Sequence, residues 1–400
     1  MTKKSDAPAI RFKGFSDAWE QRKLGDVATF FNGRAYSQPE LLSSGKYKVL
    51  RVGNFYTNDS WYYSDLELGE KYYADYGDLL YTWSATFGPH IWLGDRVIYH
   101  YHIWKIDLSN QLEKQFAVQL LEQDKANILS SKNGSTMVHI TKEGMEQKDV
   151  IIPPSTKEQQ EIGAFFQQLD NLITLHQRKF EKLTNVKKSM LEKMFPQNGS
   201  SYPEIRFKGF TDPWEQRKLG DVVKEITRND PESEAPIMMI TANNGFIEQS
   251  ERYAFNNAGE SLKKYILLKK GELAYNHGAS KLRPYGSCFA LTTAENARIP
   301  FVYHCFSAEN QNAEFMSIEL NGAEIENQLR KIVSSGARMD GLLNISFDEY
   351  TSVSVLLPGT EEQDRIADFF RHLDNLITLH QRELEKLQNI KKSMLEKMFV

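Results

Sequence analysis

The chain contains 400 residues, with 49 lysines and arginines against 53 aspartates and glutamates, which gives a net charge of −4. This length suggests two or three domains, the 40% of hydrophobic residues is typical of a folded protein, and the overall charge predicts no polyanionic partner. Two cysteines are too few for a disulfide framework or a four-cysteine zinc site, which favours a reduced, cytoplasmic protein. No apolar run reaches the roughly 18–20 residues of a membrane helix, and the N-terminus lacks the apolar segment of a secretory signal.

Two blocks of the sequence occur twice. Residues 10–27 and 205–222 are identical at 16 of 18 positions, and residues 157–195 and 361–399 are identical at 28 of 39 positions. The segments between the blocks diverge, since the first is dense in aromatic residues and the second is not. Drift after a duplication would scatter the differences. We therefore interpret the identical blocks as serving identical contacts, and the divergent segments as binding two different ligands of one general kind.

The repeat divides the chain into four parts. These are a first variable domain over residues 1–156, a long helix over 157–196, a second variable domain over 197–360 and a second long helix over 361–400. Alternation such as that of residues 97–104 predicts strands in the first variable domain. We expect an α+β protein in which two α/β domains are separated by two long helices that form an antiparallel coiled coil, with a pseudo-two-fold internal repeat.

Both long blocks carry apolar residues at helical spacing over about four heptads. Ser155 with Glu158 matches a capping box at the start of the first helix, and Pro196 ends it. Each helix of roughly 35 residues would be about 50 Å long, which is too long for one small domain to cover. The two copies are therefore expected to pair, with the histidines as a polar register-setting pair, and the wide apolar stripe leaves room for helices of another protein. The residues expected in the coiled coil and the partner interface are Phe165, Leu169, Leu172, His176, Leu183 and Met190, with Phe369, Leu373, Leu376, His380, Leu387 and Met394.

The sequence lacks the motifs of common enzymes. It has no glycine-rich phosphate loop, no dinucleotide-binding fingerprint and no nucleophile elbow. His100 and His102 share one face of an expected strand with His90 nearby, which is a spacing that metal ligands use, although two polar groups on a strand face are the simpler interpretation. We expect no catalytic residue, metal or cofactor in this chain, and an enzyme with a metal site at these histidines stays open as an alternative.

Loops at matching places in the two variable domains combine basic residues with Asn, Ser, Thr and His. A nucleic-acid binder without overall positive charge needs such clusters, because Arg and Lys contact phosphates or guanine while the polar groups contact base edges. Ordinary solvated loops are the alternative for any one of them. The candidate DNA-binding residues are Arg34, Tyr36, Tyr81, Trp83, Ser84, Thr86, His90, Lys132, Asn133, Ser135 and Thr136 in the first domain, and Asn243, Asn244, Asn276, His277, Ser280, Lys281, Arg283, Ser335 and Arg338 in the second.

The whole chain resembles the specificity (S) subunit of Type I restriction-modification systems. The resemblance rests on two divergent domains, each followed by a near-identical helix, and on four local motifs. These motifs are residues 19–27 with their copy at 214–222, Val52-Gly53-Asn54, Gly77-Asp78-Leu79, and Pro153-Pro154 with Glu158-Gln159. The second half departs from the pattern at Glu272, where aspartate is usual, and at Pro358-Gly359.

The resemblance implies that the variable units are target recognition domains, each binding one half of a bipartite DNA target in the major groove. It implies that the helices set the spacing and dock two modification subunits, which use S-adenosylmethionine to methylate a flipped adenine. Up to two restriction subunits would add translocation and cleavage that depend on ATP and Mg. This chain would be a non-catalytic recognition subunit in a bacterial or archaeal cytoplasm. A coiled-coil adaptor whose two heads bind proteins is the alternative function.

Overall fold

The computed structural model describes residues 7–56, 58–84, 86–130, 140–242, 245–252, 259–333 and 342–399. The chain forms two compact units: the first unit is Met1–Arg178 with Gln381–Val400, and the second unit is Lys179–His380. Each unit contains one variable domain together with part of each long helix. Strands and helices are mixed in both units, which confirms the predicted α+β class.

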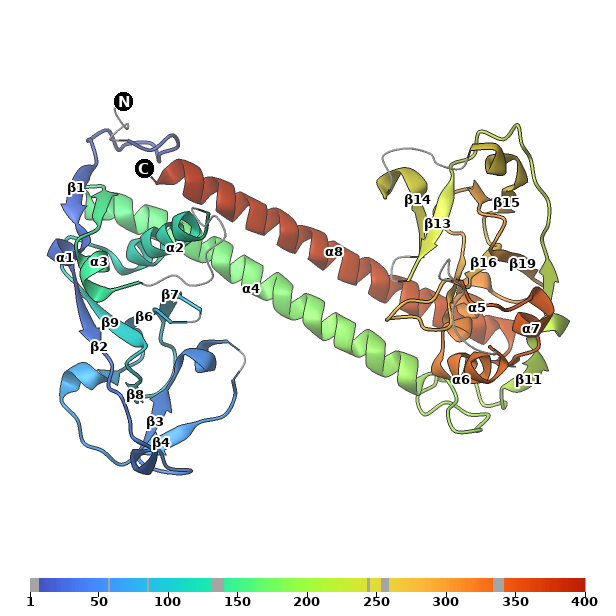
Figure 1. The fold of residues 1–400 in the computed structure, drawn as a ribbon, viewed down its shortest axis with the longest axis horizontal. Coiled ribbons are helices and arrows are strands. Elements are labelled where there is room, and N and C mark those ends of the chain that lie inside the picture. The colour runs from blue at the N-terminus through green and yellow to red at the C-terminus, as the bar shows by residue number, and fades with distance from the viewer. Residues whose placement is uncertain are drawn as a thin grey trace. The chain divides into compact units, whose positions relative to one another are not determined.

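The first unit is built on two four-stranded sheets (Figure 1). Its strands are β1 (Glu20–Lys23), β2 (Ala28–Asn32), β3 (Tyr47–Leu50), β4 (Tyr62–Ser64), β5 (Tyr73–Ala74), β6 (Leu79–Thr82), β7 (Gly88–Ile91), β8 (Val97–Tyr99), β9 (Ile103–Leu108) and β10 (Asp149–Ile152). Its helices are α1 (Leu24–Val27), α2 (Lys114–Ser130) and α3 (Lys142–Glu146), with parts of α4 (Thr156–Lys193) and α8 (Thr360–Met398). The antiparallel sheet in the order β2-β9-β6-β7 is called the first frame sheet, and the sheet β4-β3-β8-β5 is called the outer sheet.

The second unit repeats the frame sheet and replaces the outer sheet. Its strands are β11 (Glu215–Lys218), β12 (Val223–Glu225), β13 (Met238–Thr241), β14 (Gly245–Glu248), β15 (Ile266–Lys269), β16 (Leu273–Asn276), β17 (Ser287–Ala290), β18 (Asn296–Ile299), β19 (His304–Ala308) and β20 (Ser354–Leu357). Its helices are α5 (Ala313–Leu320), α6 (Ala323–Ile332) and α7 (Phe347–Thr351), with the remaining parts of α4 and α8. The second frame sheet runs β12-β19-β16-β17, in the order of the first, whereas β13-β14 and β15-β18 are separate pairs.

The repeated tryptophan block anchors each unit to the end of a long helix. The residues after Trp19 form β1, which pairs with β10, the strand that leads into α4. The Trp19 ring packs edge-on against Phe116 at 6.0 Å and Phe399 at 6.4 Å, and the equivalent Trp214 packs against Phe195 at 5.7 Å. Aromatic pairs in this geometry stabilise a core beyond the area that they bury. The identity of the blocks is therefore explained by shared packing.

A buried arginine–carboxylate pair ties the N-terminal segment of each unit to the start of its long helix. Arg11 donates to both carboxylate oxygens of Glu158 at 2.6 and 2.8 Å, and Arg206 donates to those of Glu362 at 2.7 Å each. Both carboxylates are almost fully buried. The predicted capping box is therefore only half formed: Ser155 accepts from the backbone N–H of Glu158, while the Glu158 carboxylate is engaged by the arginine.

The two long helices run antiparallel in each unit (Figure 1). In the first unit Phe166 packs against Phe399 at 6.0 Å, and Asp170 forms an ion pair with Lys391 at 2.5 Å. Residue numbers thus rise along α4 as they fall along α8. The second unit repeats the contact with the copies of these residues, because Lys187 pairs with Asp374 at 2.5 Å. This arrangement agrees with the predicted antiparallel pairing.

The seam between the helices is narrower than the heptad pattern predicts. Leu172 and Leu376, which were assigned to the seam, are 44% and 43% exposed, and Leu175 and Leu379 are exposed on the same turns. The helices pack through the neighbouring edge of the stripe, so these leucines face away from the coil. Of the other predicted interface residues, Leu169 and Leu373 are buried, while Phe165, His176, Leu183, Met190, Phe369, His380, Leu387 and Met394 are half-buried.

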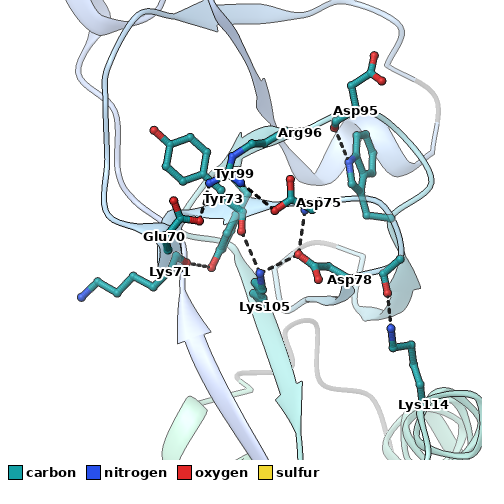
Figure 2. Close-up of polar contacts among 12 residues, drawn as sticks. Glu70, Lys71, Tyr73, Asp75, Asp78, Asp95, Arg96, Tyr99, Lys105 and Lys114 are labelled. Atoms are coloured by element: carbon teal, nitrogen blue, oxygen red, sulfur yellow. Dashed lines mark hydrogen bonds and ion pairs between the residues drawn. The ribbon is translucent and has the colours of Figure 1, made fainter.

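The Gly77-Asp78 motif closes the turn before β6 and joins it to β9 (Figure 2). Gly77 has φ +89°, a left-handed conformation that glycine adopts without strain. The Asp78 carboxylate accepts the backbone N–H of Asp75 at 2.8 Å and pairs with Lys105 of β9 at 2.7 Å. This motif is thus part of the frame.

Glu272 preserves the same function in the second unit. Its carboxylate accepts the backbone N–H of Lys269 at 2.6 Å and pairs with Arg228, while Gly271 has φ +83°. Glu272 thus keeps the turn contact of the usual aspartate, but its cation partner follows β12, whereas Lys105 lies on β9. Frame contacts of this kind recur in both units although the variable segments differ.

The outer sheet of the first unit is held together by its own polar contacts (Figure 2). Arg96 lies 4.2 Å from the centre of the Tyr73 ring and pairs with Glu70 at 2.6 Å. The Tyr99 hydroxyl donates to the carbonyl oxygen of Lys71. These contacts join β5 and β8 with the segments that precede them, so they stabilise the outer sheet from within.

Candidate nucleic-acid interface

Two predicted loops of the first unit meet at the turn between β8 and β9. Gly33 allows the approach, because a Cβ atom there would lie 2.3 Å from the carbonyl oxygen of His100. The backbone N–H of Tyr101 donates to the carbonyl of Arg34 at 3.1 Å, and the N–H of Trp83 donates to the carbonyl of His102 at 3.2 Å. The chain therefore brings residues 32–36 and 81–84, far apart in sequence, to one place.

Aromatic rings gather around this turn. The Trp83 indole N–H donates to the carbonyl of Tyr101 at 3.0 Å, and its ring centre lies 4.9 Å from that of His102. The Tyr101 and His102 rings are 3.9 Å apart, and those of His100 and His102 are 5.0 Å apart. Tyr101 is 39% exposed. We call Tyr36, Trp83, His100, Tyr101 and His102 the aromatic surface, which offers flat rings and hydrogen-bonding groups to a ligand.

The three residues of the turn were not among the predicted DNA-binding residues. His100, Tyr101 and His102 entered the sequence analysis only as strand residues or as a metal alternative. The signal that could have found them is the density of His and Tyr where the strand ends, next to a glycine-containing loop.

Arg34 is held by residues of its own loop. Its guanidinium pairs with Glu40 at 2.6 Å and lies 5.1 Å from the centre of the Tyr36 ring. The hydrogen bond from Arg34 lowers the pKa of Glu40 to about 2, so the pair is ionised at neutral pH. A phosphate contact by Arg34 would have to share this guanidinium with Glu40.

The histidines of this region are kept neutral by burial. His90 stacks on Phe55 at 4.1 Å, and its Nε2 atom lies 3.2 Å from the Tyr56 hydroxyl. Burial, the larger cause, lowers the pKa of His90 to about 4, and burial also lowers the pKa of His100 and His102. Neutral imidazoles donate and accept hydrogen bonds but do not neutralise phosphates. Their suitable targets are therefore base edges.

Tyr81 lies in the core, contrary to the prediction that it contacts DNA. Its side chain is fully buried and stacks on Trp104 with ring centres 5.9 Å apart. The cause is its place on β6, a central strand of the frame sheet whose four residues are all buried. The neighbouring Ser84 is half-buried and Thr86 is exposed, so these two remain on the accessible part of the loop.

His277 of the second unit is also a buried bracing residue instead of a surface contact. Its ring nitrogens lie 2.8 Å from the carbonyl oxygen of Leu343 and 2.7 Å from that of Val302. Only 7% of the residue is exposed. The imidazole thus joins three segments behind the loop that follows β16.

The rest of that loop is fixed by local hydrogen bonds and leaves one basic side chain outside. The Asn276 amide donates to the carbonyl of Ile240 at 3.1 Å, and the Ser280 hydroxyl accepts the backbone N–H of Arg283 at 3.0 Å. The Arg283 guanidinium is itself tied to the carbonyl of Asn321 at 2.8 Å, and burial lowers its pKa. Lys281 is exposed. Lys281 is thus the residue of this loop best placed to meet a phosphate.

Several predicted contacts lie outside the described residues: Lys132, Asn133, Ser135, Thr136, Asn243, Asn244, Ser335 and Arg338. The chain next to two of these segments does reach the loop after β16. Gly278 pairs with Leu342, and Asn276 bonds to Ile240.

Within the described ranges, no group of three or more His, Cys, Asp or Glu residues is placed to hold a metal ion. None of the helices described is both long enough and apolar enough to cross a membrane.

The fold and the surfaces together define a duplicated recognition protein, in which one frame is repeated and two different surfaces are carried on it. Residues 16–185 match the family of the Type I restriction modification DNA specificity domain. The match spans most of the first variable domain and most of α4, and the order of the frame sheet is repeated in the second unit.

Similarity to Type I specificity subunits extends over almost the full chain. The specificity subunit of the Type I restriction enzyme MjaVIII from Methanocaldococcus jannaschii is 23% identical over 404 residues, which cover 94% of this chain and 91% of that protein. The crystal structure of the Type I restriction-modification S subunit from M. genitalium matches with a TM-score of 0.64 at 14% identity, covering 98% of this chain and 99% of that chain. The latter shows a shared fold. The resemblance found in the sequence is confirmed.

Proposed function

We propose that this chain is the DNA sequence-specificity subunit of a Type I restriction-modification complex. The observation that carries the proposal is the specificity-domain match over residues 16–185, in a first unit whose frame sheet is repeated in the second unit. A protein that recognises two different half-sites needs two copies of one framework, each with a different surface. The nearly identical sequence blocks and the divergent segments between them alternate along the chain in this way. The alternative of a protein-binding adaptor is not favoured by this match.

Each unit reads one half of a bipartite target in the major groove. The aromatic surface of the first unit offers neutral rings and hydrogen-bonding groups, which suit base edges. The second unit offers exposed Lys281 beside polar residues, which suits a phosphate contact together with base readout. The net charge of −4 implies that partner subunits supply part of the phosphate neutralisation.

The long helices act as spacer and as docking site for two modification subunits. α4 has 38 residues and α8 has 39, so each is about 57–59 Å long, more than one turn of DNA at roughly 34–36 Å. Four exposed leucines have no role in the seam between the helices. They are Leu172 and Leu175 of α4 and their repeat copies, Leu376 and Leu379 of α8. Exposed apolar residues repeated in both units suit two copies of one partner.

The chemistry of the complex belongs to those partners. Modification subunits would bind S-adenosylmethionine and methylate a flipped adenine, and up to two restriction subunits would use ATP and Mg. This chain would then contribute recognition without catalysis, in the cytoplasm of a bacterium or archaeon.

The test begins by mapping methylated adenines in DNA from cells that express the complex. Duplexes that carry both half-sites, either half-site alone or neither are then titrated with the chain bound to its modification subunits, at two ionic strengths. We expect affinity for the complete target to exceed affinity for either half alone, with a salt-dependent component. Equal binding to all four duplexes would refute the assignment, and salt-independent binding would point to a protein ligand.

A further inference from the structure

A cavity in the second unit contains a buried carboxylate that the frame does not fully use. The cavity has a volume of about 720 Å³ and lies between α5, α6 and the adjoining parts of α4 and α8. Glu319 of α5 lines it and is 9% exposed. One carboxylate oxygen accepts the backbone N–H of Leu356 at 3.1 Å. The other oxygen has no hydrogen-bond partner among the residues that the structure describes.

The charges around the cavity leave an excess of carboxylate. Arg371 is paired with Glu314 at 2.8 Å, Lys187 is paired with Asp374 at 2.5 Å, and the Arg283 guanidinium is bonded to a backbone carbonyl. These cations are already engaged. In all, the charged residues of the lining are five acidic ones (Glu192, Glu314, Glu319, Glu324 and Asp374) and four basic ones (Lys187, Lys188, Arg283 and Arg371), an excess of one carboxylate.

Apolar side chains complete the walls. Phe195, Phe289 and Phe370 line the cavity, together with Leu191 and Ile318. A deep carboxylate with aromatic and aliphatic walls is complementary to a cation on an apolar stem, because the stem covers the rings while the charge meets the carboxylate. Inorganic ions lack the stem, and the buried Glu319 carboxylate disfavours anions when it is ionised.

We propose that this cavity binds the ammonium or guanidinium end of an apolar chain, with Glu319 as its counter-ion. Two sources share this chemistry: a free alkylamine or guanidine, and a lysine or arginine side chain of a partner subunit. Cation binding by the cavity does not depend on the proposed DNA function. Only the second source, a side chain of a partner subunit, rests on that function.

The first unit lacks this feature at the equivalent place. Phe116 stacks on Phe399 at 5.2 Å and Phe315 stacks on Phe195 at 5.8 Å, which aligns α2 with α5. Four residues after these helix phenylalanines, Leu120 of α2 takes the position that Glu319 takes in α5. The replacement Glu319→Leu therefore introduces a side chain that the same frame already accepts, and it serves as a matched variant.

The structural alternative is that Glu319 only satisfies the Leu356 N–H. Glu319→Gln separates the two roles, because an amide oxygen still accepts that hydrogen bond but carries no charge. Burial, the largest cause, together with the charge of Glu324 raises the pKa of Glu319 to about 7, although the hydrogen bond from the Leu356 N–H acts in the opposite direction. Cation binding needs the ionised carboxylate, so it should strengthen as the pH rises from about 6 to about 8.

The experiment is calorimetric titration of the full-length chain with n-butylguanidinium and with its neutral analogue n-butylurea. We expect the cation to bind, the urea not to bind, and both Glu319→Gln and Glu319→Leu to weaken cation binding by about tenfold or more while the melting temperature stays close to that of wild type. Equal binding of the two probes, or retained binding by a folded variant, would overturn the proposal, as would no binding of the cation at pH 8.

A second arm identifies the source of the cation. Assembly of wild type and Glu319→Gln with the modification subunit is compared by analytical ultracentrifugation. Weaker assembly of the variant identifies a partner side chain, and unchanged assembly with lost butylguanidinium binding identifies a free cation. Failure of DNA recognition in the complex would leave the calorimetric result unaffected, so the two proposals fail separately.

Discussion

The two units have nearly the same frame contacts, and they differ in the surfaces that are proposed to bind DNA. Arg11–Glu158 corresponds to Arg206–Glu362, and both frame sheets have the same strand order. On this frame the first unit carries an outer sheet and an aromatic surface, while the second carries two separate strand pairs and an exposed lysine loop. The residues of the frame are thus separate from those of the proposed recognition surfaces, so each set can change without the other.

The largest expected effect is loss of a buried frame pair. Glu158→Ala leaves Arg11 without its counter-ion, which should cost about 3 kcal/mol or more of the free energy of unfolding, and Glu362→Ala should do the same to Arg206. Glu158 also accepts the indole N–H of Trp19 at 3.3 Å.

The equivalent Trp214 N–H has no partner among the described residues, so Glu158→Ala should be the costlier change by about 1 kcal/mol. Hydrogen exchange measured by mass spectrometry in each unit resolves the two costs. Equal effects, or effects below 1 kcal/mol, would show that the frames are not held by these pairs.

DNA binding should distinguish the two surfaces. Tyr101→Ala should weaken binding by about 1–3 kcal/mol, and only for duplexes that carry the first unit's half-site. Lys281→Ala should weaken binding to all duplexes alike and lower the slope of log K against log salt by about 1. Exposed Leu93, which belongs to neither surface, is a control whose replacement by Ala should change neither quantity. Specificity that survives Tyr101→Ala would remove the aromatic surface from the interface.

The pH dependence of stability should have opposite sign in the two units. The folded state holds the pKa of His90 at about 4, below its ordinary value of 6.5, so its contribution is present above pH 6.5 and is lost as the pH falls toward 4. The pKa of Glu319 is raised from 4.5 to about 7, so its contribution is present below pH 4.5 and is lost as the pH rises toward 7.

Comparison of wild type with His90→Gln and with Glu319→Gln isolates each contribution. Hydrogen exchange of the first unit should lose part of its acid sensitivity in His90→Gln, and exchange of the second unit should lose part of its sensitivity to rising pH in Glu319→Gln. The Lys125 charge also acts on His90, and the Glu324 charge acts on Glu319. Parallel pH responses in the two variants would contradict the assigned directions.

The smallest effect is expected for the repeated ion pair between the long helices. Asp170–Lys391 and Asp374–Lys187 are partly exposed, so removal of either should cost less than about 1 kcal/mol and should be screened by salt. Asp170→Asn and Asp374→Asn, compared by thermal unfolding at two salt concentrations, measure this cost. A cost of several kcal/mol in one unit alone would show that the two halves of the coil are not equivalent.

The site was less predictable than the fold for reasons visible in particular residues. The candidate loops, among them residues 32–36 and 276–283, were chosen for their composition. Composition could not show that Arg283 is tied to Asn321, that Arg34 is shared with Glu40, or that the turn at Tyr101 lies against Trp83. Those relations join residues that are distant in the chain, and only packing brings them together.

The sequence by itself determined the duplication, the helical periodicity of the two long blocks, the α+β class and the resemblance to Type I specificity subunits, because these depend on local spacing and on residue identity. The tertiary structure decided which side chains remain accessible. Tyr81 and His277 are buried because the strands beside them are covered on both faces or braced from three sides, while Leu172 is exposed because the helices meet along a neighbouring edge. The exposed fraction of a side chain depends on contacts from the whole fold, and a local pattern of residues does not specify those contacts.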